Sequence, residues 1–554
     1  MTLKLQHIED LGAETISLGV AERGALFLAS AFLAVLPFFV VTFPPITDLP
    51  QHLAQIRLLG ETLADPGGPY RIQWWTPYGL PYALLALCSA IAPPLLAGRL
   101  AFAVIALLWV ATAHGLALHR GRSPLAAVLA SLFVFCNVVY WGFLSFALGW
   151  PVFAAWMLAT TRQVPRRRHQ VVLVAALGLV LYACHALWLL AGIAWVGVVT
   201  AAAVIRDWRS DASLRAILRP LVWRAWALAP AAVALALWTP GFQASGARSP
   251  ALWTMSPIER LNPRWLIDAA LGGLRGPIEW LLAGFVLTWV AIGVVQYRGR
   301  LRTAVDGHLL LGAALLGAFA LTLPDKYMHT IQLAERWMPF AAMLLILAAP
   351  VPRLHPALTR LAVVGVAGLF VAATSLKWIG FERRELSGLV DAVDRLPPNP
   401  RVLGLDYQQR SAFVRGRPFL QTYAWAQVVK GGTPNFSFAS FPTSLVVFRS
   451  QLPTPWTPQL YWFPRRLRAT DLDHFDYVII NGAPGEHRAV TMAWGFQPLT
   501  TTGSWRLYRI DHGVAGITAA VAEASYRAGR EEGWGGRWDS NPRQPESQSG
   551  ALTN

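Results

Sequence analysis

The segment that follows the first long apolar run carries side chains suited to acid–base chemistry. Residues 43–52 read FPPITDLPQH, which places Asp48 and His52 one helical turn apart. A carboxylate such as Asp48 can accept a proton from a hydroxyl group or help to hold a divalent cation, and an imidazole can also transfer protons. Pro50 suits the first turn of a helix that Asp48 or Thr47 would cap. A capping role is therefore the alternative for Asp48, and an interfacial polar role is the alternative for His52.

A second group of side chains suits the binding of phosphate. Lys326, His329 and Arg336 lie within one short polar segment, residues 324–336. Lysine offers a point charge, and arginine offers two parallel N–H donors that match phosphate oxygens. The alternatives are a pair that faces lipid headgroups, or a local salt bridge between Glu335 and Arg336.

Arg57 and His185 are two further candidates for binding substrate or phosphate. Arg57 lies on the segment after Asp48, where contact with lipid headgroups would also explain a cation. His185 lies inside an apolar run, and polar groups in membrane segments are costly and therefore often functional. If the run bends at His185, the side chain simply lies at the membrane interface.

The composition places these residues in a membrane protein. Of 554 residues, 55% are hydrophobic and 14% are charged, whereas soluble domains carry about 25% charged residues. The net charge of +17 comes mostly from arginines in short loops between apolar runs, which indicates membrane topology rather than nucleic-acid binding. Cys88, Cys136 and Cys184 lie in apolar runs at spacings that argue against a metal motif and a disulfide framework.

Eleven apolar runs are candidates for membrane-spanning helices, each of which needs roughly 20 residues. The runs lie at residues 24–43, 100–118, 124–142, 143–161, 170–184, 186–205, 225–239, 277–296, 308–323, 337–351 and 358–377. The sequence therefore predicts an α-helical polytopic membrane bundle of about 11 spans over residues 24–377. Residues 1–23 are predicted to be a cytoplasmic N-terminus.

One further run, residues 79–97, decides the topology. Pro81, Pro93 and Pro94 interrupt this run, which favours a re-entrant or surface segment over a span. With this choice every arginine-rich loop faces the cytoplasm, as the positive-inside rule prefers. The outer loops are then residues 44–99, 240–276 and 324–336.

The residues after Asp48 are predicted to form a helix that lies on the outer membrane surface. Apolar residues recur at helical spacing along one face, namely Leu49, Leu53, Ile56, Leu59 and Leu63. Gln51, Gln55 and Glu61 lie largely away from this face. An apolar face towards lipid and a polar face towards water would hold this helix in the interface, with Asp48 at the mouth of the bundle.

The pattern changes after residue 377. Residues 383–396 are predicted to form an amphipathic helix that ends at Pro397 and Pro398. Predicted strands, rich in β-branched and aromatic residues, lie at residues 402–405, 444–448, 477–480 and 505–510. Strands that alternate with helical pieces indicate a small extracytoplasmic α/β domain over residues 378–512. Residues 513–554 are predicted to be a disordered tail, because their last part shows no core-forming pattern.

An acidic residue just beyond the first span, followed by a surface helix, many spans and an outer C-terminal domain, resembles the GT-C glycosyltransferase superfamily. The string Asp-Leu-Pro-x-His at residues 48–52 resembles a mostly uncharacterised bacterial branch. Three further strings resemble the same branch, namely YWGF at 140–143, CH at 184–185 and ERW at 335–337. The resemblance implies that Asp48 activates the acceptor or helps to hold a divalent cation such as Mg²⁺ or Mn²⁺.

One departure from this superfamily concerns the acids near Asp48. Many members carry a paired acid in the first outer loop or in the next one. Here Glu61 and Asp65 are the only other acids within residues 44–99, and both lie far along the predicted helix. The catalytic role of Asp48 and any bound metal therefore depend on the position of this one residue.

The resemblance predicts a glycosyltransferase at the outer face of a bacterial inner membrane. It would move a hexose or pentose from a polyprenyl-phosphate donor to a lipid or glycan acceptor, with membrane lipids and no nucleic acid as partners. One alternative is a transporter or flippase of a lipid-linked or envelope precursor, which would favour repeated halves and charges near the bilayer midplane. The other alternative is a non-catalytic envelope assembly protein, for which eleven spans exceed what anchoring needs.

Overall fold

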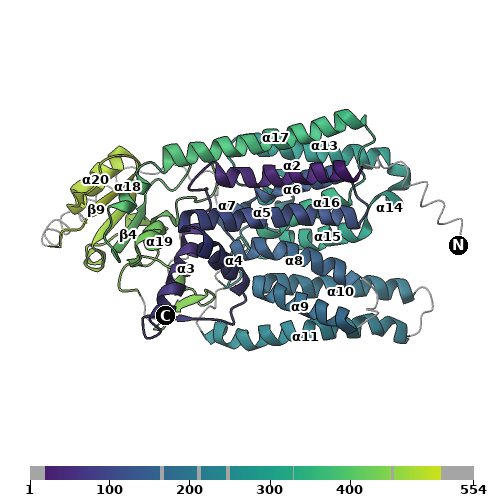
Figure 1. The fold of residues 1–554 in the computed structure, drawn as a ribbon, viewed down its shortest axis with the longest axis horizontal. Coiled ribbons are helices and arrows are strands. Elements are labelled where there is room, and N and C mark those ends of the chain that lie inside the picture. The colour runs from purple at the N-terminus through teal and green to yellow at the C-terminus, as the bar shows by residue number, and fades with distance from the viewer. Residues whose placement is uncertain are drawn as a thin grey trace.

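The computed structural model describes residues 19–161, 168–208, 214–244, 250–328, 330–450 and 454–512. These residues form a bundle of roughly parallel helices with a small sheet domain at one end of its long axis (Figure 1). Both parts of the predicted fold, the helical membrane bundle and the α/β domain, are therefore confirmed. The predicted tail and most of the predicted cytoplasmic N-terminus lie outside the described residues.

Each of the eleven apolar runs is helical in the structure. Within the described residues, eight helical segments are long and apolar enough to cross a membrane, or nine if the bent pair at 298–304 and 307–322 is one span. The remaining two runs correspond to α9 and α16, which are shorter. The bundle helices are α2 (Val20–Phe39), α5 (Pro94–His119), α6 (Pro124–Ser131), α7 (Asn137–Trp141), α8 (Leu144–Thr161), α9 (Arg168–Cys184), α10 (Ala186–Trp208), α11 (Leu214–Ala244), α12 (Pro263–Ala270), α13 (Ile278–Gln296), α14 (Leu301–Ala304), α15 (Gly307–Thr322), α16 (Met338–Ala348) and α17 (Pro356–Gly380).

Large apolar side chains remain exposed along the outer helices. Leu28 on α2, Val172 on α9 and Leu369 on α17 each expose more than half of their surface. A soluble protein would bury such side chains, whereas lipid covers them without cost. Together with the apolar helices, this exposure identifies a multi-pass membrane protein.

Arginines gather at the end of the bundle that lies away from the sheet domain. Arg120 forms a salt bridge with Asp306 at 2.7 Å, and Arg122 donates hydrogen bonds to carbonyl groups at the C-terminal ends of α14 and α16. Arg360 at the start of α17 pairs with Glu22 at the start of α2. These arginines thus lie at one end of the bundle, residues 162–167 of another arginine-rich loop lie outside the described residues, and a common side of the membrane stays a prediction.

Helix α4 (Gly79–Ile91) lies at the domain end of the bundle and does not cross it. Its first turn is near α3, because the Tyr82 hydroxyl lies 3.1 Å from Nδ1 of His52. The helix that follows, α5, also begins at this end, where a side chain at Gly98 would touch Leu49 and Leu53. With its 13 residues, α4 is about 20 Å long and shorter than the apolar core of a bilayer. This length agrees with the predicted re-entrant or surface segment, whose position in a membrane stays a prediction.

The sheet domain has five strands in the order β5-β4-β7-β9-β8. The neighbours of β4 are parallel to it, and β9 is antiparallel to both β7 and β8. The strands are β4 (Arg401–Asp406), β5 (Thr433–Pro434), β7 (Tyr477–Asn481), β8 (Gln497–Pro498) and β9 (Trp505–Arg509), and the helices are α18 (Leu389–Asp394), α19 (Trp425–Lys430) and α20 (Pro484–Trp494). Three of the four predicted strands thus form the sheet.

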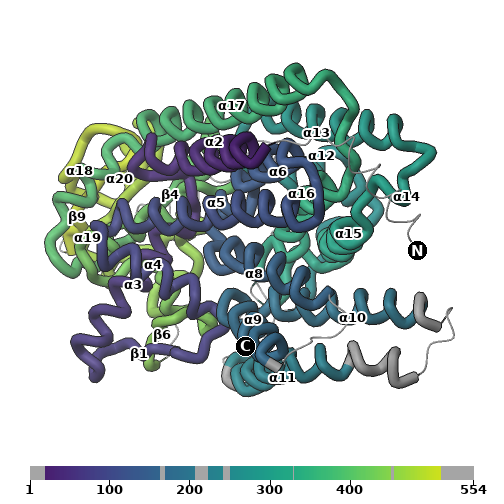
Figure 2. Tube along the Cα trace, turned by 45° about the vertical axis from the view of Figure 1, so that its right-hand side comes forward, coloured from purple at the N-terminus to yellow at the C-terminus, as the bar shows by residue number. Residues whose placement is uncertain are grey.

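Two predictions for this domain need correction. The predicted helix at 383–396 is broken, because Gly388 has a left-handed φ of +85° between a π-helical turn, Phe381–Glu385, and α18. The predicted strand at 444–448 forms β6 (Val446–Phe448), but it does not join the sheet. Instead, β6 pairs with β1 (Tyr70–Ile72) of the first outer loop, well apart from β4 and β9 (Figure 2).

The prediction that α3 (Leu49–Ala64) lies on the membrane surface is wrong. Gln51 and Gln55 are fully buried against the C-terminal domain. The Gln55 amide bonds both the N–H and the carbonyl of Val446, and the Gln51 amide bonds the N–H of Phe438 and the carbonyl of Phe436. The polar face of α3 therefore binds protein backbone rather than water, and α3 lies between the bundle and the domain.

Candidate active site

The backbone around Asp48 is fixed against the end of α7. The N–H groups of Thr47 and Asp48 donate to the carbonyls of Tyr140 and Trp141, at 2.9 and 3.1 Å. Gly142 follows with a left-handed φ of +80°, and a Cβ there would lie 2.9 Å from the Asp48 nitrogen. Only glycine allows this close approach, so the YWGF string positions Asp48.

The Asp48 carboxylate does not cap α3, although Asp48 occupies the N-cap position. No hydrogen bond joins this carboxylate to a backbone N–H of the helix, and the residue has helical rather than extended dihedral angles. Burial raises the pKa of Asp48 to about 8, while the charge of Arg336 acts to lower it. Capping of α3 therefore does not explain Asp48, and with a pKa near 8 its carboxyl group is mostly protonated at neutral pH but can titrate close to it.

Arg336 is a buried cation whose charge acts on this carboxyl group. It lies in the short helix η4 (Glu335–Trp337), with its guanidinium 3.5 Å from the centroid of the Phe143 ring. One Nη donates to the carbonyl of Ile331, and the buried Nε has no partner among the described residues. Burial lowers the pKa of Arg336 to about 10, so the side chain remains protonated at neutral pH. A buried cation with an unused donor is suited to bind an anion.

The proposed salt bridge between Glu335 and Arg336 does not form within the described residues. Glu335 instead accepts a hydrogen bond from the Asn137 amide at 3.3 Å. Burial raises the pKa of Glu335 to about 7. Arg336 is therefore not neutralised by its neighbour in the chain, and its positive charge acts on Asp48.

His52 uses both ring nitrogens for hydrogen bonds within the protein. Its Nε2 lies 3.0 Å from the carbonyl of Gly142, which can only accept, so Nε2 carries the proton. Its Nδ1 lies 3.1 Å from the Tyr82 hydroxyl, which must then donate. Burial lowers the pKa of His52 to about 4, which keeps the ring neutral. This geometry suits a positioning residue rather than the catalytic residue that the sequence predicts.

Replacing His52 by Phe is expected to lower the free energy of unfolding by about 1–3 kcal/mol, because Gly142 and Tyr82 lose their partners. Thermal unfolding of the purified protein in detergent measures this loss. The matched control is Tyr82→Phe, which removes only one of the two hydrogen bonds of His52. Because the folded pKa of His52 lies below the unfolded value, wild type should lose stability as the pH falls from 6.5 towards 4. The His52→Phe variant should not show this loss of stability between pH 6.5 and 4. The same loss in the variant as in wild type would contradict the assignment of the lowered pKa to His52.

His185 lies at the turn between α9 and α10 and is buried. Its Nδ1 accepts a hydrogen bond from the N–H of Leu187, which caps the start of α10. Its ring meets the edges of Tyr78 at 4.8 Å and Phe146 at 5.5 Å between centroids. The charge of Arg336 also acts on this imidazole. His185 thus lies among the aromatic side chains near Arg336, and no contact of its ring with Asp48 is seen among the described residues.

The other predicted phosphate ligands are less closely connected to Asp48. Lys326 lies in the hairpin β2 (Lys326–Tyr327) with β3 (Thr330–Ile331), and no contact of its side chain with Asp48 is seen among the described residues. Arg57 pairs with Glu61 at 2.8 Å and donates to backbone carbonyls of α19, which holds α3 against the domain. His329 lies outside the described residues. Phosphate binding by these three side chains stays a prediction.

The predicted divalent cation finds no set of protein ligands at Asp48. Among the described residues, no three side chains of His, Cys, Asp or Glu gather in one place. The charged neighbour of Asp48 is the guanidinium of Arg336, which repels a cation. These residues do not fit a protein-held metal, so the reaction proposed below uses none.

Tyrosines from distant parts of the chain surround Asp48, and the sequence did not reveal them. The charge of Asp48 acts on the hydroxyls of Tyr82, Tyr423 and Tyr461, although burial is the larger influence on each. Tyr423 and Tyr461 come from the C-terminal domain, some 380 to 410 residues further along the chain. No periodicity or motif links such segments, so only the folded chain brings them together.

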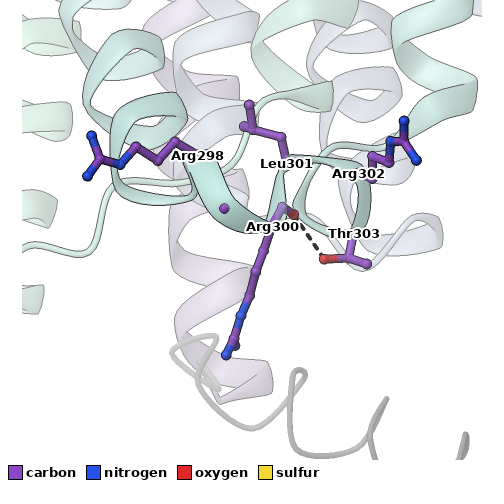
Figure 3. A pocket seen from close by; sticks show the side chains of 6 residues that line it. Arg298, Arg300, Leu301, Arg302 and Thr303 are labelled. Carbon is purple, nitrogen blue, oxygen red and sulfur yellow. Dashed lines mark hydrogen bonds between the residues drawn. The ribbon is translucent and has the colours of Figure 1, made fainter.

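A hollow at the opposite end of the bundle is not a second candidate site. It is lined by Arg298–Thr303, and its three arginines point in different directions (Figure 3). Each of these arginines is exposed, as expected for side chains near lipid headgroups. They do not converge on a common point, and none is near Asp48.

Comparisons with known proteins give a fold relationship. No protein-family model matches the chain, and no curated protein matches its sequence. The structure is similar to crystal structures of ArnT from Cupriavidus metallidurans, one bound to undecaprenyl phosphate and one in the apo state, each with a TM-score of 0.50. The identities are 13% and 14%, over 90% and 89% of this chain and 100% and 98% of the ArnT chains. The chain therefore has an ArnT-like fold.

Proposed function

We propose that this protein is a membrane glycosyltransferase that moves a sugar from a polyprenyl-phosphate donor to a lipid or glycan acceptor. The observation that carries the proposal is the position of Asp48 and Arg336, whose charges act on each other, at the domain end of an ArnT-like fold. The half-buried Asp48 carboxyl group has a pKa near 8, and the buried Arg336 guanidinium has an Nε without a partner among the described residues. The undecaprenyl phosphate bound to one ArnT structure supports a polyprenyl-phosphate ligand.

The two groups match the two charges that develop in such a transfer. Asp48 takes the proton from the acceptor hydroxyl as its oxygen attacks the anomeric carbon of the sugar. A new bond forms between that carbon and the acceptor oxygen, and the bond from the carbon to the carrier phosphate oxygen breaks. The phosphate leaves with the bonding electrons, and Arg336 stabilises its charge. Attack from the side opposite the leaving phosphate inverts the anomeric configuration.

The positive-inside rule supports an orientation for this reaction. The arginine-rich end of the bundle would face the cytoplasm, which places Asp48, Arg336 and the C-terminal domain on the outer face. We propose the bacterial inner membrane as the location, with the N-terminus inside.

The experiment that tests this function is transfer by the purified full-length protein in lipid nanodiscs. The donors are radiolabelled undecaprenyl-phosphate hexoses and pentoses, and the acceptors are envelope lipids extracted from a strain that lacks this gene. We expect label from one of these donors to move into an acceptor lipid, with release of undecaprenyl phosphate. Absence of transfer from every donor, with intact folding, would overturn the proposal.

A further inference from the structure

The C-terminal domain places two of its segments directly against the start of α3. The Thr47 hydroxyl donates a hydrogen bond of 3.4 Å to the carbonyl of Arg417. The Gln51 amide donates one of 3.1 Å to the carbonyl of Phe436. These bonds lie on either side of Asp48 in the sequence, so the domain is fixed close to this residue.

Three aromatic side chains on the domain form a wall beside this contact, which we call the aromatic wall: Phe436, Tyr461 and Trp462. The rings of Phe436 and Tyr461 stack at 4.1 Å between centroids with an interplanar angle of 19°. Trp462 lies 6.2 Å from Tyr461, and the guanidinium of Arg417 lies 5.4 Å from the Trp462 ring. All three aromatic residues are only half-buried, so part of each stays accessible.

Hydrogen bonds on both sides of Asp48 place this wall near it, because Gln51 bonds the backbone of Phe436 and Thr47 bonds the backbone of Arg417, whose guanidinium lies over Trp462. The charge of Asp48 also acts on the Tyr461 hydroxyl and raises its pKa, in addition to the larger effect of burial. Arg336, in contrast, contacts Phe143 and Phe146 of the bundle and the carbonyl of Ile331. Asp48 therefore has the cation on its bundle side and the aromatic wall on its domain side.

We propose that the aromatic wall binds the sugar ring of a carbohydrate-bearing acceptor. This inference rests on the proposed function and assigns its acceptor side to the C-terminal domain. The C–H groups of a pyranose ring carry a small positive charge and pack against the negative face of an aromatic ring. Sites for small polar molecules commonly combine such rings with a few polar groups, which Tyr461 and Asp48 supply here.

The acceptor rather than the donor is assigned to the wall because of where the reacting groups lie. The base has to contact the acceptor hydroxyl, and the cation has to contact the carrier phosphate. With Arg336 on the bundle side, the donor phosphate approaches from that side. The acceptor hydroxyl then reaches Asp48 from the domain side, along the aromatic wall.

The test measures transfer as a function of acceptor concentration, with the labelled donor and extracted envelope lipids described above. Tyr461→Ala should raise the half-saturating acceptor concentration roughly tenfold, because it removes the centre of the wall. The rate at saturating acceptor should stay close to wild type. Tyr461→Phe keeps the stacked ring but loses the hydroxyl, so its half-saturating acceptor concentration should lie between those of wild type and Tyr461→Ala.

Two controls separate this inference from a general loss of structure and from the proposed function. Tyr477→Ala removes a half-buried tyrosine at the start of β7, at the opposite end of that strand from Asn481, and should leave the acceptor dependence unchanged. Binding of undecaprenyl phosphate and the melting temperature should be equal in wild type and Tyr461→Phe, and binding should persist in Tyr461→Ala. An unchanged acceptor dependence in Tyr461→Ala would overturn the acceptor site alone, whereas no transfer by wild type would overturn both proposals.

Discussion

Replacing Asp48 by Asn is expected to lower sugar transfer roughly 10³-fold while the protein remains folded. The amide has nearly the same shape as the carboxyl group but cannot accept the acceptor proton. In wild type, kcat/KM should rise with pH through about 8, because the free protein must first release the proton from Asp48. The pH profile of the Asn variant should lack this rise.

The direction in which Asp48→Asn changes the stability of the protein follows from the same pKa. The folded pKa of Asp48, about 8, exceeds its ordinary value of 3.8, so the folded chain holds a proton that the unfolded chain releases between these values. The carboxyl group therefore costs stability at pH 8, and the Asn variant should melt at the same or a higher temperature there. Asp65→Asn is the matched control, because Asp65 is exposed in the same outer loop. Full transfer activity of Asp48→Asn would contradict the assignment of the base.

Replacing Arg336 by Ala is expected to weaken binding of undecaprenyl phosphate and to lower transfer roughly 10²–10³-fold. The variant loses a buried guanidinium whose Nε has no partner among the described residues. Arg336→Lys should recover little, because an ammonium group cannot supply two parallel donors to one phosphate. Native mass spectrometry of the purified protein with undecaprenyl phosphate measures the binding directly.

A second measurement on the Arg336 variants separates a phosphate ligand from a structural cation. Arg336 lowers the pKa of Asp48, so its removal should shift the rise of any residual activity to a pH above 8. Lys326→Ala should weaken binding less than Arg336→Ala, because no contact joins Lys326 to Asp48 among the described residues. Equal binding of undecaprenyl phosphate by wild type and Arg336→Ala would contradict the proposed phosphate site.

The sequence predicts the membrane part of this fold well, because each span is a local property of the chain. Runs of apolar residues and the distribution of arginines identify the helices and the non-crossing α4 without any long-range information. The central strands β4 and β7 are also local, since buried parallel strands are continuous apolar runs, and the antiparallel β9 is marked by its aromatic residues.

The arrangement around α3 could not be predicted in this way. A polar helix face towards water and a polar face towards buried backbone have the same residue pattern, so Gln51 and Gln55 give no signal for the choice. Asp48 and Arg336 were identified from residue type and position, but their proximity depends on the packing of the start of α3 against Tyr140–Trp141 and of Arg336 against Phe143. The contribution of Tyr461 required the folded domain, because it combines segments that lie about 400 residues apart.

The pairing of the first outer loop with the C-terminal domain has a consequence for biogenesis. Tyr70–Ile72 and the amides of Gln51 and Gln55 have partners within Phe436–Phe448, and Gln51 also bonds Gln421. During synthesis this loop leaves the ribosome first, and these partners follow only when most of the chain has been made. Chains that stop before residue 436 therefore leave hydrogen-bonding groups of this loop without their partners. Whether the hydrogen bonds of the first loop are formed thus depends on whether the last domain has been completed.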